Sequence, residues 1–371
     1  MNEKKSVKVL EVFDSLEISG GVQAVVMNVF RVIDHDIVQM DFAVYQNPKE
    51  NSYHDEIEQH GGKVIPVNNP GSCGLIGFYR QFCNIFENEH YDAVHAHNIH
   101  HNGLILLAAK KAGIPIRISH SHQACDERNT SLPRRLIASI LKLINNRVAT
   151  RRVACSDFAG KFLYGKKSFE FLPNAINLDK FNIEESKETL RKNYNLPREK
   201  IILIHVGHFY YPKNQFFLID IMKNLKDFNC ILLMAGNGPL FDEFNIKVKE
   251  SNLEDKIICL GLRNDIPQLL LLSDCMLLPS IYEGLPVVAI EAQAEGCYCL
   301  ISDSVTKQSD LGLGLVEFLP INNSEMWASL IRKHDYKSVV TSRKMVQEKM
   351  KELKFDANSN LLSWYELYGL N

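Results

Sequence analysis

Two acidic residues, Glu283 and Glu291, are separated by seven residues where an apolar, strand-like run gives way to a helical pattern. Pro286 suits the first position of that helix, because its missing N–H would have no partner there. The other N–H groups of the first turn form an anion site of the kind that holds a diphosphate, and Gly284 lets the backbone approach the ligand. Glu291, in the second turn, can accept two hydrogen bonds from a vicinal diol such as a ribose. The pattern predicts a nucleotide-diphosphate site; two ordinary solvated acids are the alternative.

Glycine-containing loops and a lysine follow other strand-like runs. Gly207-His208 comes after the first strand of the second half of the chain, Lys213 stands shortly after it, and Gly236-Asn237-Gly238 follows the next strand. Because ligands bind at the carboxyl ends of parallel strands, we expect Lys213 to contact phosphate, with a surface lysine as the alternative. Gly20-Gly21 stands between the first strand of the chain and a helix. Loops of this kind can place backbone N–H groups beside a phosphate or an acceptor. The alternative is that the glycines only form tight turns.

Histidines are concentrated in one part of the chain: seven of the thirteen lie between His90 and His122. His95 and His97 alternate at the end of one predicted strand, and His120 and His122 at the end of a later one, so each pair shares a face. A metal site is one interpretation. No Asp or Cys stands beside them at a ligand-like spacing, so we expect no metal ion. Histidines that only cap a strand end are the other alternative.

The elements that must position these residues form a repeating pattern. Short β-branched runs alternate with helical patterns, which predicts right-handed βαβ units and a parallel sheet. The pattern restarts after Leu172-Pro173-Asn174, so we expect two doubly wound α/β domains, 1–173 and 174–354. The tail, 355–371, should form a helix that crosses back to complete the first domain, since its aromatic residues need a surface to pack on. These are Trp364, Tyr365 and Tyr368.

The motifs together resemble family 4 of the glycosyltransferases over nearly the whole chain. The family's signature is an acid, seven residues and a second acid, with Gly-Leu-Pro after the first, as in Glu283 to Glu291. Further similar segments are Gly20-Gly21-Val22, Tyr91 to Asn98, Leu172 to Ile176, Val206-Gly207 to Lys213-Asn214 and Ala235 to Pro239. The nearest members are bacterial exopolysaccharide and capsule glycosyltransferases. The resemblance implies the GT-B fold, with two Rossmann-like domains facing across a cleft, and a retaining enzyme.

The resemblance also implies roles for individual residues. Glu283 would contact the donor sugar and Glu291 the ribose, and either His120 or His122 would lie beside the reacting carbon. The sequence departs from the family at His208, where members carry an arginine, so the charge on phosphate is only partial. The donor-binding set is Gly207, His208, Lys213, Gly236, Asn237, Gly238, Arg263, Glu283, Gly284, Leu285, Pro286 and Glu291. The acceptor or phosphate loop is Gly20, Gly21, His97 and Asn174, and the catalytic residues are Glu283, His120, His122, Lys213 and His208.

The resulting hypothesis is transfer of a sugar from a nucleotide-diphosphate donor, a UDP-sugar, to a saccharide acceptor that is lipid-linked. In retaining enzymes of this type the leaving phosphate takes the acceptor proton, so no dedicated base is required. We expect no metal or other cofactor, because the donor domain has no Asp-x-Asp. Two alternatives remain open. One is a GT-B-like UDP-sugar epimerase, and the other is a catalytically silent partner that binds nucleotide sugar, which the His208 departure allows.

Composition limits the partners. The 371 residues carry a net charge of −2, which gives no general attraction to nucleic acid, and no apolar run is long enough to span a membrane. We therefore expect a cytoplasmic protein with reduced cysteines. Arg134-Arg135, with Arg128 before them and Lys142 and Arg147 after them, lie near apolar residues, namely Leu132, Leu136, Ile137, Ile140, Leu141 and Leu143. This resembles an amphipathic helix that rests on the anionic inner face of the membrane, with an ordinary solvated helix as the alternative.

Overall fold

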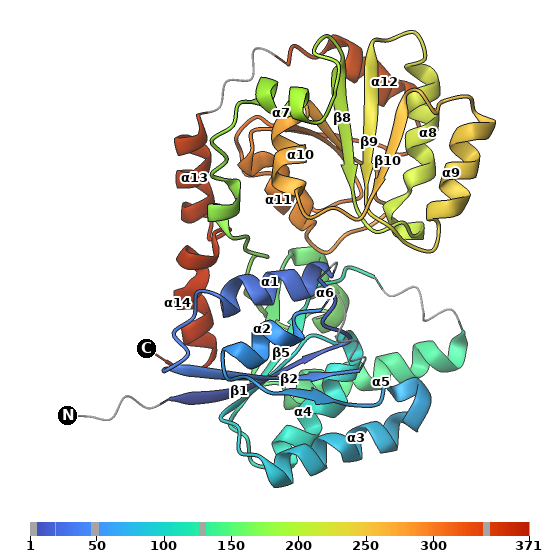
Figure 1. The fold of residues 1–371 in the computed structure, drawn as a ribbon. Coiled ribbons are helices and arrows are strands. Elements are labelled where there is room, and N and C mark those ends of the chain that lie inside the picture. The colour runs from blue at the N-terminus through green and yellow to red at the C-terminus, as the bar shows by residue number, and fades with distance from the viewer. Residues whose placement is uncertain (1–5, 19, 46–51, 126–130, 337–341, 371) are drawn as a thin grey trace. The chain divides into compact units, whose positions relative to one another are not determined.

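The computed structural model describes residues 6–18, 20–45, 52–125, 131–336 and 342–370. The chain divides into two compact units (Figure 1). Unit 1 is Met1–Ala175 with Ala357–Asn371, and unit 2 is Ile176–Asp356. Both junctions lie two residues later than the sequence suggested, at 175 instead of 173 and at 356 instead of 354. Within the described ranges, no helix has the length and apolar character needed to cross a membrane.

Unit 1 is built on a seven-stranded parallel sheet in the order β3-β2-β1-β4-β5-β6-β7. Its strands are β1 (Val7–Phe13), β2 (Val38–Val44), β3 (Val64–Pro66), β4 (Ala93–Ala96), β5 (Ile116–Ser121), β6 (Arg151–Ala154) and β7 (Glu170–Phe171). The central strands are mostly apolar on both faces, as expected for a parallel sheet that helices cover on both sides, and the buried Glu11 and His95 are exceptions. The short edge strand β7 was not predicted from the sequence.

The helices of unit 1 include the C-terminal helix, as predicted. They are α1 (Gly21–Phe30), α2 (His54–Gln59), α3 (Pro70–Asn88), η1 (Ile99–His101), α4 (Asn102–Lys111), α5 (Leu132–Val148), α6 (Asp157–Tyr164) and α14 (Ala357–Leu367). Figure 1 shows the red α14 beside the blue α1, and the two helices are in contact. Trp364 and Tyr368 are both 1% exposed and belong to the core that covers one face of the sheet.

Unit 2 repeats this architecture with a six-stranded parallel sheet in the order β10-β9-β8-β11-β12-β13. The strands are β8 (Ile201–Val206), β9 (Cys230–Ala235), β10 (Ile257–Gly261), β11 (Cys275–Leu278), β12 (Tyr298–Ser302) and β13 (Val316–Leu319). The helices are η2 (Leu178–Phe181), α7 (Lys187–Asn193), η3 (Tyr211–Lys213), α8 (Gln215–Asn224), α9 (Phe241–Glu250), α10 (Ile266–Leu272), α11 (Val287–Ala294), η4 (Lys307–Ser309), α12 (Ser324–Lys333) and α13 (Arg343–Glu352).

Each sheet reverses its strand order once, between β1 and β4 in unit 1 and between β8 and β11 in unit 2. Ligands of doubly wound sheets bind outside the carboxyl ends of the strands at such a reversal. Nearly all the predicted site residues follow these four strands or their immediate neighbours β5 and β9. The topology therefore gathers them at two places, one in each unit.

Candidate active site

An ion pair lies at the strand reversal of unit 2. Lys213 ends η3, which follows β8, and Glu283 lies in the loop after β11; Nζ and Oε1 are 2.5 Å apart. The side chains are only 15% and 13% exposed, and the Ser280 hydroxyl also donates to Glu283 Oε1 at 2.8 Å. Burial acts to lower the pKa of Lys213, but the Glu283 carboxylate outweighs it and holds that pKa above its ordinary value. The sequence predicted both Lys213 and Glu283 as site residues, but it did not predict that the two form an ion pair.

The helix after this loop, α11, begins one residue later than predicted. Pro286 is its N-cap, with an extended backbone (φ −71°, ψ 109°), and Val287 is the first helical residue. No side chain caps the helix. In the part of the chain that the structure describes, the N–H groups of Val287 and Val288 make no hydrogen bond, while that of Ala289 donates to Pro286 O. Two backbone donors and the positive end of the helix dipole are therefore available to an anion.

Glu291 lies in the second turn of α11, as predicted. Burial raises its pKa to about 7, and the charge of Lys180 only partly opposes this shift. Among the described residues its carboxylate makes no hydrogen bond, although the side chain is partly buried. A desolvated acid without a protein partner is costly unless a ligand supplies one. The hydroxyls of a ribose are suitable donors for it.

His208 lies on an exposed loop after β8, with its ring 5.4 Å from that of Tyr210. A hydrogen bond holds the backbone of this loop in place, because Gln215 Nε2 donates to the His208 carbonyl at 2.9 Å. The position fits a group that reaches a ligand at the end of β8. A histidine at this position, where the family carries an arginine, remains the main departure from the family pattern.

The glycines after β9 serve the packing of two loops. A Cβ on Gly236 would lie 2.0 Å from the carbonyl oxygen of Gly207, and one on Gly238 would lie 2.5 Å from that of Phe209. The Phe209 N–H donates to the Asn237 carbonyl at 2.9 Å. The loop after β9 therefore packs directly on the loop that carries His208. A tight approach of two backbones, rather than a ligand, already accounts for these glycines.

Arg263, predicted in the donor set, is paired elsewhere. Its guanidinium makes a bidentate interaction with Asp265, at 2.8 Å from Nε and 2.5 Å from Nη2. Asp265 also accepts from the hydroxyl of Tyr194. None of these hydrogen bonds reaches Lys213 or Glu283, so the structure does not connect Arg263 to the ion pair.

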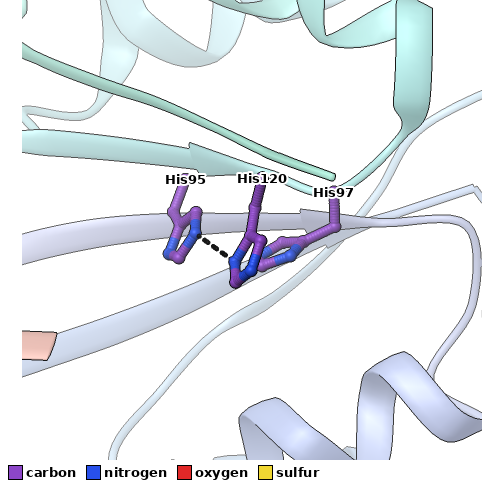
Figure 2. A group of neighbouring side chains, drawn as sticks. All are labelled: His95, His97 and His120. Carbon is purple, nitrogen blue, oxygen red and sulfur yellow. Dashed lines mark hydrogen bonds between the residues drawn. The ribbon is translucent and has the colours of Figure 1, made fainter. Parts of the chain in front are cut away.

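The strand reversal of unit 1 carries a buried cluster of four histidines and one acid. Glu11 on β1 is in register with His95 on β4. The β4–β5 register pairs His95 with Ile118, and hydrogen bonds join His95 and His97 diagonally to His120 and His122. All five side chains are at most 8% exposed. Figure 2 shows three of the rings side by side, with His95 Nε2 3.1 Å from His120 Nδ1. The two predicted histidine pairs thus form one group.

Three histidines of this cluster, His97, His120 and His122, are held in the neutral form. Burial lowers the pKa of His97 and of His120 well below the ordinary value, and the neighbouring histidines lower both further. Burial also lowers the pKa of His122 to about 3. Ligand atoms of His95, His97 and His120 lie within 4.8 Å of one another, the spacing of a metal site. The ring nitrogens that face each other are already hydrogen-bonded, which fits the expectation of no metal; that expectation stays a prediction.

Glu11 is the functional candidate that sequence reasoning missed. Its side chain is 0% exposed, and its carboxylate contacts His97 Nε2 at 2.8 Å and the Tyr368 hydroxyl at 2.7 Å. A signal was present, because an acid inside a buried parallel strand requires a partner. The partner could not be found from the sequence alone, since Tyr368 lies on the C-terminal segment.

The remaining predicted residues of unit 1 surround this cluster or begin α1. Asn174 is buried, and Oδ1 lies 3.2 Å from His122 Nδ1. Gly20 is the N-cap of α1, which no side chain caps. A Cβ on Gly21 would meet no atom within 4 Å, so open space faces this helix start.

The basic amphipathic helix predicted from sequence is α5, and it exposes apolar side chains to solvent. Leu132, Leu136 and Leu143 are 80%, 64% and 70% exposed, and Ile137 and Ile140 are also exposed. Arg134 and Arg135 are exposed on the same helix, whereas Arg128 lies outside the described residues. Leu141 is a correction: it is 3% exposed and packs into the core, because it faces α4 and the sheet.

Both units match sequence models of known families. The model described as "Glycosyl transferase 4-like domain" matches residues 20–166, and the model described as "Glycosyl transferases group 1" matches residues 186–333. The first match lies in unit 1 and the second in unit 2. Two Rossmann-like units with these matches define a glycosyltransferase of the GT-B type.

Curated relatives extend over most of the chain. EpsF of Bacillus subtilis (strain 168), named as a glycosyltransferase, is 33% identical over 98% of this chain and 97% of its own. Capsular polysaccharide biosynthesis glycosyltransferase CapH of Staphylococcus aureus is 26% identical, covering 88% and 90%. An Escherichia coli protein named UDP-Gal:alpha-D-GlcNAc-diphosphoundecaprenol alpha-1,3-galactosyltransferase is 28% identical, covering 62% and 61%. The chain belongs to the family 4 glycosyltransferases, and it is an enzyme that transfers sugars.

Solved structures agree on the fold. Anabaena HepE in complex with UDP superposes with a TM-score of 0.77 over 98% of this chain and 100% of its own, at 17% sequence identity. The prediction of a GT-B architecture with two doubly wound domains is confirmed.

Proposed function

We propose that the enzyme transfers a sugar, with retention of configuration, from a UDP-sugar to a lipid-linked saccharide during synthesis of a capsular or exported polysaccharide. The Lys213–Glu283 pair beside the uncapped start of α11 is the observation that carries the proposal. A relative is named for UDP-Gal and a diphosphoundecaprenol acceptor, another for capsular polysaccharide, and HepE binds UDP. These names support the donor and acceptor classes.

Donor binding would use the charged residues of unit 2 one after another. The diphosphate competes for Lys213 and accepts hydrogen bonds from the N–H groups of Val287 and Val288, while Glu291 accepts from the ribose. Once Lys213 turns to phosphate, the Glu283 carboxylate is released toward the hydroxyls of the donor sugar. His208 adds a charge at the end of β8 when it is protonated.

The transfer step then needs positioning and charge neutralisation more than a protein base. The bond between the anomeric carbon and the phosphate oxygen breaks, and the acceptor oxygen bonds to the same face of that carbon. The leaving phosphate oxygen takes the acceptor proton. His120 or His122 would contact the reacting sugar through a neutral imidazole, in keeping with the low pKa of both rings.

We also propose that no metal ion takes part. A divalent cation that bridges a diphosphate takes oxygen ligands, commonly carboxylates close in sequence. The acid nearest the proposed phosphate position, Glu283, is already held by Lys213 and Ser280. A lysine and a helix start would supply the positive charge in place of the metal.

The acceptor would reach the enzyme at the inner face of the membrane, where α5 rests on anionic lipid. The exposed Leu136 and Leu143 would enter the bilayer while Arg134 and Arg135 contact phosphate head groups. Flotation with phosphatidylglycerol vesicles tests this. Wild type should float and Leu136→Glu/Leu143→Glu should not, whereas Leu262→Glu, a control at a 66% exposed leucine of unit 2, should float like wild type. Equal flotation of all three would contradict the membrane contact.

The function itself is tested with a panel of UDP- and GDP-sugars, each added with and without a diphosphoundecaprenol-linked saccharide. Transfer only in the presence of the acceptor supports the proposal. Conversion of the donor sugar without acceptor would instead indicate an epimerase. Tight nucleotide binding without any turnover would indicate a silent partner of another transferase.

A further inference from the structure

The Glu11 carboxylate connects two hydrogen-bonded chains of histidine side chains in unit 1. Glu11 Oε2 lies 2.8 Å from His97 Nε2, and His97 Nδ1 lies 2.9 Å from His122 Nε2. Glu11 Oε1 lies 3.3 Å from His95 Nδ1, and His95 Nε2 lies 3.1 Å from His120 Nδ1. Each chain therefore runs from the same acid through one histidine of β4 to one histidine of β5.

The direction of every proton in these chains follows from the acid. A carboxylate only accepts hydrogen bonds, so His97 must carry its proton on Nε2. The hydroxyl of Tyr368 donates to Glu11 Oε1 at 2.7 Å, which commits the proton of that hydroxyl. His95 Nδ1 lies 3.3 Å from both the Tyr368 oxygen and Glu11 Oε1, two acceptors, so it must carry the proton of its ring.

The next ring in each chain is then fixed as well. A neutral imidazole has one donor and one acceptor nitrogen, so His97 Nδ1 is an acceptor. With His95 neutral as well, its Nε2 is also an acceptor. The N–H groups that meet them are Nε2–H of His122 and Nδ1–H of His120. Two lone pairs remain at the far ends of the chains, on His122 Nδ1 and on His120 Nε2.

These two nitrogens are the ends that a ligand can use. His120 Nε2 is buried and has no hydrogen-bond partner among the described residues. His122 Nδ1 faces the side-chain amide of Asn174 at 3.2 Å, and an acceptor nitrogen there requires that amide to be rotated so that its NH₂ group donates. Both ends therefore accept hydrogen bonds and do not donate them. The lone pair of His120 Nε2 is available to a hydroxyl, whereas that of His122 Nδ1 becomes available when a hydroxyl replaces the Asn174 amide.

We propose that Glu11 and Tyr368 are positioning residues that set the tautomers of all four histidines, so that His120 and His122 present acceptor nitrogens to a sugar hydroxyl. The choice of a sugar hydroxyl as ligand rests on the proposed function; the tautomers themselves do not. The C-terminal segment thereby contributes to the chemistry of unit 1, in addition to packing on its sheet.

Nitrogen NMR of histidine-labelled full-length protein tests the tautomers without any assay of turnover. Single His→Gln variants assign the rings. The result expected is Nε2–H in His97 and His122 and Nδ1–H in His95 and His120. A doubly protonated His97 beside an Nδ1–H tautomer of His122 would overturn the proposal, and so would a zinc ion bound to these rings in the purified protein.

Variants of the acid and of the tyrosine separate positioning from folding. Glu11→Gln replaces an acceptor oxygen by an NH₂ donor, so it should change or mix the tautomers of His97 and His122. Tyr368→Phe removes one of the two acceptors that face His95 Nδ1 and leaves, among the described residues, only the 3.3 Å contact with Glu11, so it should mix the tautomers of His95 and His120 while leaving the other chain intact. Asp41→Asn and Tyr91→Phe are matched controls, because Tyr91 donates to the buried Asp41 at 2.9 Å in the same unit. The controls should leave all four tautomers unchanged. If Glu11→Gln does not fold, Tyr368→Phe still decides; unchanged tautomers in it would remove Tyr368 from the proposal.

Kinetics connects the tautomers to function. In Glu11→Gln, kcat should fall by about 10² to 10⁴-fold, the range seen when a catalytic histidine loses its base partner or its tautomer, with the donor KM nearly unchanged. A matching loss in the Asp41→Asn control would show a structural effect only. If wild type transfers no sugar while the tautomers are as stated, the proposed function fails and the positioning network stands.

Discussion

The two strand reversals of this enzyme carry polar groups of opposite character. In unit 2, Lys213 and Glu283 form a pair of full charges beside an uncapped helix start. In unit 1, a single acid, Glu11, is surrounded by a tyrosine hydroxyl and by histidines, of which burial keeps His97, His120 and His122 neutral. The folds are alike, so the difference in chemistry comes from a few side chains at the ends of the strands.

The difference suggests a division of labour. A diphosphate is strongly charged, and only a site that holds a cation and free N–H groups can balance it. A sugar hydroxyl is neutral, and buried neutral acceptors bind it without an uncompensated charge. The unit 2 pair also keeps Lys213 charged while the site is empty, because Glu283 offsets the cost of burial.

The largest expected effect comes from breaking the charged pair. Lys213→Ala should lower kcat by about 10²- to 10³-fold, since it removes a donor to the developing phosphate charge. It also leaves Glu283 buried without its cation, with only the Ser280 hydroxyl as a partner among the described residues, and breaking a buried ion pair in this way destabilises a fold by up to about 3–5 kcal/mol.

The double variant Lys213→Ala/Glu283→Ala separates these two losses. It should regain most of the free energy of unfolding, measured by urea denaturation, but none of the activity. Recovery of activity in the double variant would show that Lys213 acts only by neutralising Glu283.

The second effect concerns nucleotide affinity. Glu291→Ala should weaken UDP binding by about 3 kcal/mol, or roughly a hundredfold, through loss of two hydrogen bonds to the ribose. Glu295→Gln is the matched control. Burial raises the pKa of Glu295 to about 7 as well, but this acid contacts Arg343. Calorimetry should find normal UDP affinity in the control; equal weakening in both variants would place the effect in the packing of α11.

A third, smaller effect is the pH dependence of stability. Burial raises the folded-state pKa of Glu291 to about 7, above the value of about 4.3 in an unfolded chain. Folding therefore disfavours the charged form of Glu291. The contribution of this residue to the free energy of unfolding falls as the pH rises from about 4 to about 7. Glu291→Gln should melt at a higher temperature than wild type near pH 8, with the difference vanishing near pH 4. A difference that grows toward acid would contradict this sign.

The smallest effect is expected at His208. Its charge on the diphosphate disappears as the pH rises, so UDP affinity should decline on the alkaline side in wild type. His208→Arg should keep or improve affinity and flatten that decline, because a guanidinium stays charged. Titrations with UDP across the pH range measure both. A His208→Arg enzyme that binds no UDP would show that the arginine of the family has no equivalent role here.

Much of this account was accessible from the sequence because the signals are local. The strand Cys230–Ala235 is a continuous apolar run and Ile201–Val206 is an apolar run broken only by His205, and the predicted bounds of both agree with the structure. The two acids, the loop between them and the restart of the pattern near Asn174 are likewise segments of neighbouring residues. Such features need no knowledge of which strands are adjacent.

What sequence could not supply depends on adjacency. Lys213 meets Glu283 only because β8 and β11 are neighbours in the sheet, and Glu11 meets His97 only because β1 lies beside β4. The glycines after β9 show the same limit, since their reason is the backbone of another loop. The predicted start of α11 differs from the observed start by one residue, because Pro286 is the N-cap of the helix and not its first residue.

The stereochemistry of the product, formed after exhaustive chelation, tests the central claim most directly. The enzyme is incubated in EDTA with its UDP-sugar and a diphosphoundecaprenol-linked acceptor, and proton NMR reads the anomeric configuration of the new bond. The account predicts undiminished transfer and a product with the donor's configuration, because Lys213 and the start of α11 replace a metal. Loss of activity that Mg²⁺ or Mn²⁺ restores, or an inverted product, would contradict it.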